Sequence, residues 1–141
     1  MYDYEYITFE VRDRVGILTL NRPEKFNGMN DPLIAECIDA IKTAEKDPDV
    51  GALIVTGAGK AFCAGGDINE MREKALGPIT AYPHMQNYAQ FTQALTNSTL
   101  PVIGAINGVA AGGGLSLVLM CDVVFASEKS KFRSAFQGIG L

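Results

Sequence analysis

The sequence predicts an α/β fold in which most strands pair in parallel. Stretches typical of strands and helices alternate along the 141 residues, in the order strand, strand, helix, strand, helix, helix, strand, helix, strand. Twice, a short apolar strand runs into glycines and then into a helix, in LIVTGAGKAFCAGGDI and in VIGAINGVAAGGGLSL. Hydrophobic residues make up 48% of the chain and charged residues 20%, which is the composition of a globular domain with a real core.

The first predicted element is a hairpin. Ile7, Phe9 and Val11 alternate with polar residues, and a second apolar run covers residues 15–20. Asp13 and Arg14 stand between the two runs and are expected to form the turn. A polar loop, NRPEKFNGMN, follows the hairpin.

The segment NDPLIAECIDAIKTAEKD carries the signals of a helix. Asp31 is the predicted N-cap, and Pro32 is predicted as the first helical residue. The apolar residues recur at helical spacing and predict a buried face. That face combines Ile34, Ile38 and Ile41 with Leu33, Cys37, Ala40 and Ala44 beside them.

The remaining elements alternate between short strands and helices. Asp67 is expected to cap or anchor the helix that follows it. The expected elements are the strand GALIVTG, the helix DINEMREKA, a helix over residues 80–97 that carries Met85, Tyr88, Phe91, Thr92 and Leu95, the strand PVIGAING, a buried helix that begins in GGGLSLVLMCD, and the strand VVFAS.

Composition argues against several classes of function. The formal net charge of −4 provides no basic face for nucleic acid. The longest apolar run, residues 109–120, is too short to span a bilayer, so no membrane partner is expected. Cys37, Cys63 and Cys121 are widely spaced, which is typical of reduced thiols rather than of a disulfide framework. The polar opening of the chain does not resemble a signal peptide, and a cytoplasmic location is expected.

The glycine-rich stretch GAGKAFCAGGDINEM does not fit the usual phosphate motifs. A P-loop requires Ser or Thr after Gly59-Lys60, but Ala61 stands there, and Ile54 replaces the first glycine. In a dinucleotide fingerprint Phe62 would replace the third glycine. A nucleotide cofactor is therefore not expected.

Metal and hydrolase chemistry are not expected either. His84 is the single histidine, and Cys63 with Asp67 is not a ligand set. His84 is interpreted as a surface or partly packed side chain rather than as a catalyst. Ser116 lies in GGGLSLV, which lacks the second glycine of a nucleophile elbow.

Two equivalent glycine loops allow a different interpretation. Each loop can offer one backbone N–H to one shared oxygen, and such a pair forms an oxyanion hole. The glycines could instead serve only tight turns and close helix packing, which is the better interpretation of either loop alone. The presence of two equivalent loops about fifty residues apart favours the oxyanion hole.

Three segments resemble the crotonase family, the enoyl-CoA hydratases and isomerases. KAFCAGGDINEM and PVIGAINGVAAGGGLSLVLMCDVVFASEKSKF match the central motifs, and VGILTLNRPEKFNGMN is similar to the N-terminal hairpin and CoA-contacting loop. The resemblance covers essentially the whole chain and ends about halfway through a typical member. It implies a truncated crotonase-like (ClpP/crotonase) spiral of ββα units. Residues 1–141 would form the N-terminal part of a single domain, and the apolar ending FQGIGL agrees with this.

The resemblance implies an acyl-CoA thioester as substrate and an enolate-like intermediate. The thioester oxygen would be held by the backbone N–H groups of Gly66 and Gly113. CoA would be carried by the substrate, so no separate cofactor is expected. Members are usually trimers or pairs of trimers, so the full-length protein is expected to be a homotrimer or hexamer.

The resemblance also implies contacts with the CoA moiety. Adenine contacts would fall near Ala64 and Ile68, with Gly65 and Asp67 in the same loop, and Lys25 would face the CoA phosphates. In this last region the sequence departs from the family, because Phe26 stands where a polar or basic residue is usual.

The catalytic carboxylates of the hydratases are missing. Ser116 and Phe136 occupy the positions of the two hydratase glutamates and are assigned to the substrate site. The helper histidine of the aryl-CoA dehalogenases would fall at Ala89. The ending SAFQGIGL resembles isomerase-type members, whose acid would follow just past Leu141.

The expected parent is therefore an isomerase-type enzyme, and this chain alone is expected to bind CoA esters weakly and to lack activity. The alternatives are a non-catalytic acyl-CoA-binding remnant, or a hydratase or aryl-CoA dehalogenase-like lyase or hydrolase.

Overall fold

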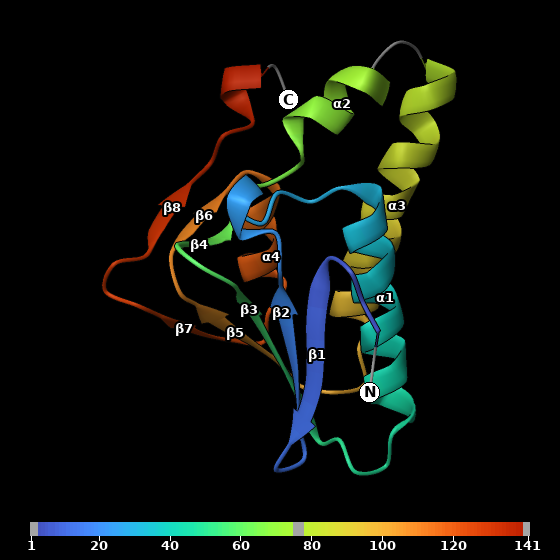
Figure 1. Ribbon diagram of the computed structural model, residues 1–141, viewed down its shortest axis with the longest axis vertical. Coiled ribbons are helices and arrows are strands. Elements are labelled where there is room, and N and C mark those ends of the chain that lie inside the picture. The colour runs from blue at the N-terminus through green and yellow to red at the C-terminus, as the bar shows by residue number, and fades with distance from the viewer. Residues whose placement is uncertain (1–2, 75–77, 140–141) are drawn as a thin grey trace.

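The computed structural model describes residues 3–74 and 78–139 (Figure 1). The described strands are β1 (Ile7–Arg12), β2 (Val15–Leu20), β3 (Ala52–Gly57), β4 (Ala61–Cys63), β5 (Val102–Ile106), β6 (Val109–Ala111), β7 (Val123–Ala126) and β8 (Lys131–Arg133). The α-helices are α1 (Asp31–Lys46), α2 (Ile68–Lys74), α3 (Pro78–Thr96) and α4 (Gly113–Leu119), and short 3-10 turns cover Pro23–Lys25 and Gln137–Ile139.

The strands form two sheets. The larger has the order β1-β2-β3-β5-β7, and the smaller has the order β4-β6-β8. Only β1 and β2 pair antiparallel among the strands of the described residues, and every other pair is parallel. Each long strand from β3 onward is followed by a short strand of the second sheet. This repeat confirms the predicted α/β class and the spiral of ββα units.

The sequence analysis missed β4, β6 and β8, which form the whole second sheet. Each has three residues, and three residues are too few to show the alternation by which a strand is recognised. The predicted hairpin, by contrast, is confirmed. Asp13 and Arg14 have φ values of 51° and 66°, the left-handed conformation of a tight turn between right-twisted strands.

The start of α1 differs from the prediction by one residue. Asn30, not Asp31, is the N-cap, because its backbone is extended and its side-chain oxygen accepts a hydrogen bond from the Leu33 N–H at 3.1 Å. Asp31 is the first helical residue, and Pro32 follows it. The buried face is shifted as well, since Ile38 is only half-buried. The fully buried residues of the helix are Leu33, Ile34, Cys37, Ala40, Ile41 and Ala44.

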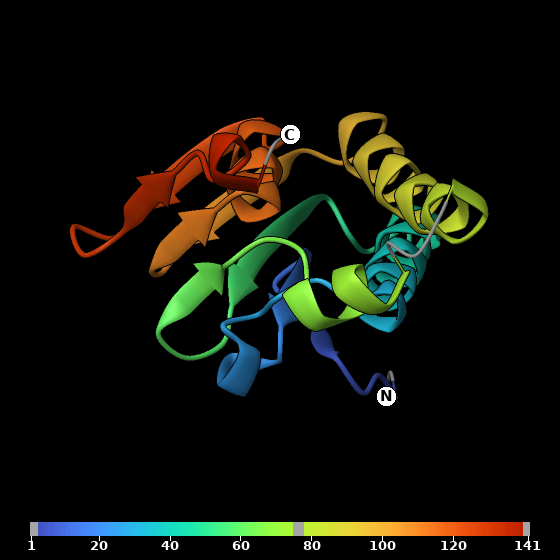
Figure 2. The same cartoon turned by 90° about the horizontal axis from the view of Figure 1, so that it is seen from above.

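The core lies between the larger sheet and the pair formed by α1 and α3. These two helices run side by side along the sheet (Figure 1). Seen from above, the pair lies on one side of the molecule and strands β6 and β8 lie on the other (Figure 2). The side chains of Leu20, Leu53, Leu33, Phe91 and Leu95 are buried together in this core.

The end of the described chain is more open than the core. The predicted helix after the second glycine loop is present as α4, but it is short, and Leu119 is 77% exposed. The predicted strand VVFAS is present as β7, and all four of its residues are exposed. Apolar side chains such as Phe125 therefore face outward here. No helix in the described residues has the length and apolar character needed to cross a membrane.

Candidate functional site

A cavity of about 330 Å³ lies between α2, α3 and α4, beside the ends of β4 and β6. Both glycine loops reach it directly after these neighbouring parallel strands, so the sheet brings the loops to the same edge. Apart from the glycines, most of the lining is apolar and suits an acyl chain rather than a sugar or an ion. The apolar lining includes Met29, Ile68, Met71, Met85, Phe91, Leu117, Met120 and Phe136.

The first loop is held by a single parallel bridge to Met29. The Met29 N–H donates to the Gly65 carbonyl at 2.8 Å, and the Asp67 N–H donates to the Met29 carbonyl at 2.7 Å. Because main-chain groups of successive extended residues point in opposite directions, the N–H of Gly66 faces away from this bridge. Gly66 itself lines the cavity.

The second loop lies against the first. Gly65 has a φ of +103°, and a Cβ built there would lie 2.9 Å from the Ala111 carbonyl and 3.2 Å from the Gly113 nitrogen. A side chain at this position would therefore push the two loops apart. Gly65 thus allows the main chains of the two loops to approach each other closely.

In the described part of the chain, the N–H groups of Gly66 and Gly113 are both left without an acceptor. Gly113 is the first residue of α4, where N–H groups have no partner within the helix. Among the hydrogen bonds of residues 3–74 and 78–139, none is donated by either of these two groups. Both residues line the cavity, so the arrangement can bind one oxygen atom that carries partial negative charge.

The side chain of Asp67 anchors the first loop. Its Oδ2 lies 2.9 Å from an Arg22 guanidinium nitrogen, and its Oδ1 accepts hydrogen bonds from the N–H groups of Asn69 and Glu70 at 3.0 and 3.4 Å. Burial raises the pKa of Asp67, but these hydrogen bonds and the positive charge of Arg22 outweigh it and hold the pKa below its ordinary value. The predicted cap of α2 is thus present, although Asp67 does not line the cavity.

The other predicted CoA contacts lie at the outer side of the loop. The Ala64 N–H donates to the Phe26 carbonyl at 3.0 Å, which fixes the exposed turn that carries Lys25 next to Ala64. Ala64 and Ile68 line the mouth of the cavity and are exposed, whereas Lys25 is exposed outside it. Lys25, Ala64 and Ile68 together form one exposed surface beside the loop, here called the ledge. Their contact with CoA stays a prediction.

Ser116 and Phe136 both line the cavity, and their role in a substrate site stays a prediction. Ser116 lies on α4, one turn after Gly113. Ala89 is exposed on α3 and does not belong to the lining. Among the described residues that line the cavity, none is an aspartate or a glutamate.

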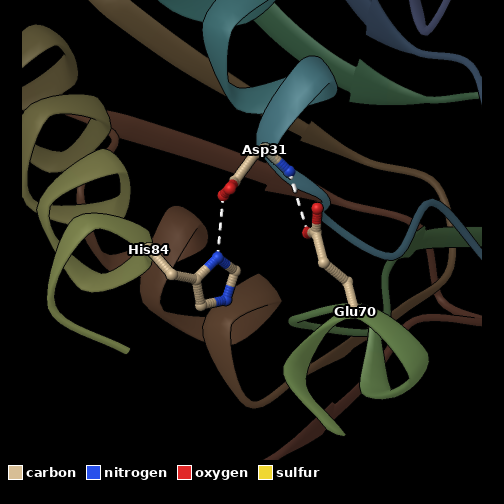
Figure 3. A group of neighbouring side chains, drawn as sticks. All are labelled: Asp31, Glu70 and His84. Atoms are coloured by element: carbon tan, nitrogen blue, oxygen red, sulfur yellow. Dashed lines mark hydrogen bonds and ion pairs between the residues drawn. The ribbon is translucent and has the colours of Figure 1, made fainter. Parts of the chain in front are cut away.

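His84 is the functional candidate that the sequence analysis missed. It was interpreted as a surface or partly packed side chain, but the structure buries it to 6% exposure in the cavity wall. Its Nδ1 lies 2.8 Å from Oδ1 of Asp31 (Figure 3). Its ring meets the Tyr88 ring edge to face, with 5.1 Å between the ring centroids. No motif signals this pair, because 53 residues separate Asp31 from His84 in the sequence.

One group in the described part of the chain could bring three metal ligands together. Side-chain atoms of Asp31, Glu70 and His84 lie within 4.8 Å of one another. Hydrogen bonds already join them, since the Asp31 N–H donates to Oε2 of Glu70 at 2.9 Å and Oδ1 of Asp31 meets the His84 ring. A cation would have to replace the contact between Asp31 and His84 in order to bind there.

The three cysteines are free thiols. Burial raises the pKa of Cys37 far above its ordinary value, and it raises the pKa of Cys63 to about 12 and that of Cys121 to about 11. The thiolate, which is the nucleophilic form, is therefore scarce at neutral pH, and the cysteines are structural.

Residues 10–141 match the family described as enoyl-CoA hydratase/isomerase. A mitochondrial enoyl-CoA hydratase of Pongo abelii is 41% identical over 133 residues, which cover 92% of this chain and 44% of that protein. A 1,2-epoxyphenylacetyl-CoA isomerase of Escherichia coli K12 is 40% identical over 139 residues, which cover 97% of this chain and 53% of that protein.

Solved structures agree with this match. The structure of an enoyl-CoA hydratase/isomerase from Mycobacterium paratuberculosis has a TM-score of 0.90 at 30% identity, covering 99% of this chain and 57% of that one. The chain thus spans about half the length of the relatives it matches.

Proposed function

The chain belongs to the enoyl-CoA hydratase/isomerase family, and on that premise we propose that it binds an acyl-CoA thioester and polarises its carbonyl oxygen. The oxygen would be held by the N–H groups of Gly66 and Gly113. One observation carries the proposal. Two glycines whose main-chain N–H groups have no acceptor among the described residues line the same apolar cavity, each in a loop that follows one of two neighbouring strands.

The same donors favour an enolate over the ground-state thioester. When a proton leaves a carbon next to the carbonyl, negative charge develops on the oxygen, and donors fixed in advance stabilise this charge more than they stabilise the neutral carbonyl. The bridge to Met29 and the contact between Gly65 and the second loop provide that rigidity. Lys25, Ala64, Gly65, Asp67 and Ile68 would bind or support the CoA moiety at the ledge.

The proposed reaction class is isomerisation of an enoyl-CoA rather than hydration. The lining of the cavity contains Ser116 and Phe136 and, among the described residues, no carboxylate that could activate water. An isomerase moves one proton between carbons and needs no bound water. The whole protein is proposed to work as a trimer or a pair of trimers.

The proposal can be tested by comparing two ligands that differ only at the carbonyl. A straight-chain 2-enoyl-CoA should bind the full-length protein more tightly than the matching CoA thioether, which lacks the carbonyl oxygen. Hydrogen bonds to the conjugated carbonyl should also shift its ultraviolet absorption to longer wavelength. Equal affinity for the two ligands and an unshifted spectrum would refute the proposed oxyanion hole.

The alternatives separate in the same assay. A non-catalytic binding remnant would bind the thioester with the spectral shift but would not exchange its carbon-bound protons with solvent deuterium. A hydratase would convert the 2-enoyl-CoA to a 3-hydroxyacyl-CoA, which mass spectrometry detects as a gain of one water.

A further inference from the structure

We propose that His84 is a catalytic proton carrier in this cavity and that Asp31 positions it. The inference rests on the proposed function, because the proton it moves is one that the bound thioester acidifies. Within the described residues, Nε2 of His84 is the one buried side-chain nitrogen or oxygen without a hydrogen-bond partner. Leaving such an atom unpaired costs about 1–3 kcal/mol, so its retention calls for an explanation.

The hydrogen bond to Asp31 fixes which ring nitrogen can act as a base. An ionised carboxylate only accepts hydrogen bonds, so Nδ1 of His84 must carry the proton in the 2.8 Å contact with Asp31. In the neutral imidazole, Nε2 then holds the lone pair. Figure 3 shows Nε2 on the side of the ring turned away from Asp31. His84 lines the cavity, and its Nε2 lies buried within the wall against which a bound acyl chain would pack.

Three elements hold the ring in place. Asp31 is the first residue of α1, where the helix end favours a negative charge, and its own N–H donates to Oε2 of Glu70 on α2. Tyr88, one turn after His84 on α3, packs edge to face against the imidazole. A base that is oriented by a third group, as His84 is by Asp31, is the arrangement that enzymes use to activate a proton transfer.

The proposed step balances without any added reactant. Nε2 of His84 takes a proton from an acyl carbon whose C–H bond is conjugated with the thioester carbonyl. The electron pair of that C–H bond moves into the acyl π system and onto the oxygen held by Gly66 and Gly113. The imidazolium, stabilised by Asp31, returns the proton to another carbon of the same π system, and the double bond has moved.

The tautomer can be tested without any activity. His84 is the single histidine of the 141 residues, so labelling with 15N-histidine reports on this ring alone. At a pH where the ring is neutral, the NMR spectrum should show a protonated Nδ1 and an unprotonated Nε2, and Asp31→Asn should disturb that assignment. A protonated Nε2 in the unsubstituted chain would overturn the proposal.

The chemical role is tested by exchange of acyl protons in deuterated water, with the protein encoded by the gene and a 2-enoyl-CoA. His84→Asn keeps a donor near the place of Nδ1 and removes Nε2. We expect it to bind the thioester within about threefold of the unsubstituted protein but to lose exchange by about 10²–10⁴-fold. Gln86→Ala on the exposed side of α3 is the matched control and should exchange normally.

The outcomes separate the two proposals. If His84→Asn exchanges normally while the spectral shift of the bound thioester remains, His84 is not the proton carrier and the oxyanion hole stands. If the unsubstituted protein binds the thioester without any exchange, the proton-carrier role is also overturned. Loss of exchange after treatment with a chelator would overturn the proton-carrier role of His84 in favour of a metal ion held by Asp31, Glu70 and His84.

Discussion

The two walls of the cavity are built in different ways. One wall is main chain, the N–H groups of Gly66 and Gly113, fixed by a bridge to Met29 and by neighbouring strands. The other wall is side chain, in which His84 on α3 meets Asp31 at the start of α1. In the proposed reaction, the first wall binds and polarises the thioester oxygen, and the second moves a proton. On this proposal, binding of the carbonyl oxygen and proton transfer depend on separate parts of the fold, so substitutions in one wall should impair one and spare the other.

The largest expected effect comes from removing one donor of the main-chain wall. Gly113→Pro deletes the N–H, and proline is tolerated at the start of a helix. Loss of one such donor costs about 3 kcal/mol, so kcat/KM of the protein encoded by the gene should fall by about 10²–10³-fold.

Gly113→Ala is the matched control, because alanine keeps the donor. Its methyl would lie 2.7 Å from Cε of Met29, the mobile end of a flexible side chain, so the loss should stay below about tenfold. Equal losses of kcat/KM in the two variants would show that position 113 requires the absence of a side chain rather than the N–H group.

The next effect concerns the fit between the two loops rather than their chemistry. Gly65→Ala places a side chain at a φ of +103° and 2.9 Å from the Ala111 carbonyl. We expect the free energy of unfolding to fall by about 2–3 kcal/mol, measured by urea denaturation. Gly51→Ala is the control, since its Cβ would meet only the Arg14 carbonyl at 3.8 Å. Equal free energies of unfolding for the two variants would contradict the prediction that the loops leave no room for a side chain at Gly65.

The main-chain wall could be predicted from sequence, and the side-chain wall could not. The glycines of the two loops follow equivalent apolar strands, so a local pattern pointed to the two loops, and the family resemblance pointed to Gly66 and Gly113. His84 has no such signal, because its neighbours Tyr82 and Met85 are exposed and its partner lies on another helix. Only the packing of α1 against α3 brings Asp31 to it.

The fold shows the same division. Elements with a repeating pattern, such as β1, β2 and α1, were predicted, while β4, β6 and β8 were missed because three residues carry no period. The N-cap of α1 was placed one residue late, since Asn30 and Asp31 are both good caps and only the backbone conformation distinguishes them. The features that were missed from the sequence are therefore those set by long-range contacts rather than by local residue preferences.

A smaller effect tests the support behind the main-chain wall. Asp67→Asn removes the charge that pairs with Arg22, and we expect a loss of about 1.5 kcal/mol in the free energy of unfolding at pH 7. The pKa of Asp67 is lower in the folded than in the unfolded chain, so this stabilisation is present above the unfolded value and is lost as the pH falls through the folded value. The difference between variant and parent should therefore shrink below about pH 4.

Urea denaturation at pH 7 and at pH 3 measures that change. Asp49→Asn, at an exposed position, is the control and should leave the pH dependence as it is in the parent. An undiminished difference for Asp67→Asn at pH 3 would mean that the carboxylate charge is not what anchors the loop.

The smallest effect is expected at Tyr88, which touches both walls. Burial raises the pKa of Tyr88, so its hydroxyl stays protonated and donates to the Met29 carbonyl at 3.0 Å, while its ring packs on His84. Tyr88→Phe keeps the ring and removes only the hydroxyl. The Met29 carbonyl retains the Asp67 N–H at 2.7 Å, so no buried acceptor is left unpaired, and the loss should be about 1 kcal/mol in urea denaturation. A loss of unfolding free energy as large as that of Gly65→Ala would show that this hydroxyl holds the first glycine loop against α3. The two walls would then form one structural unit rather than two separate ones.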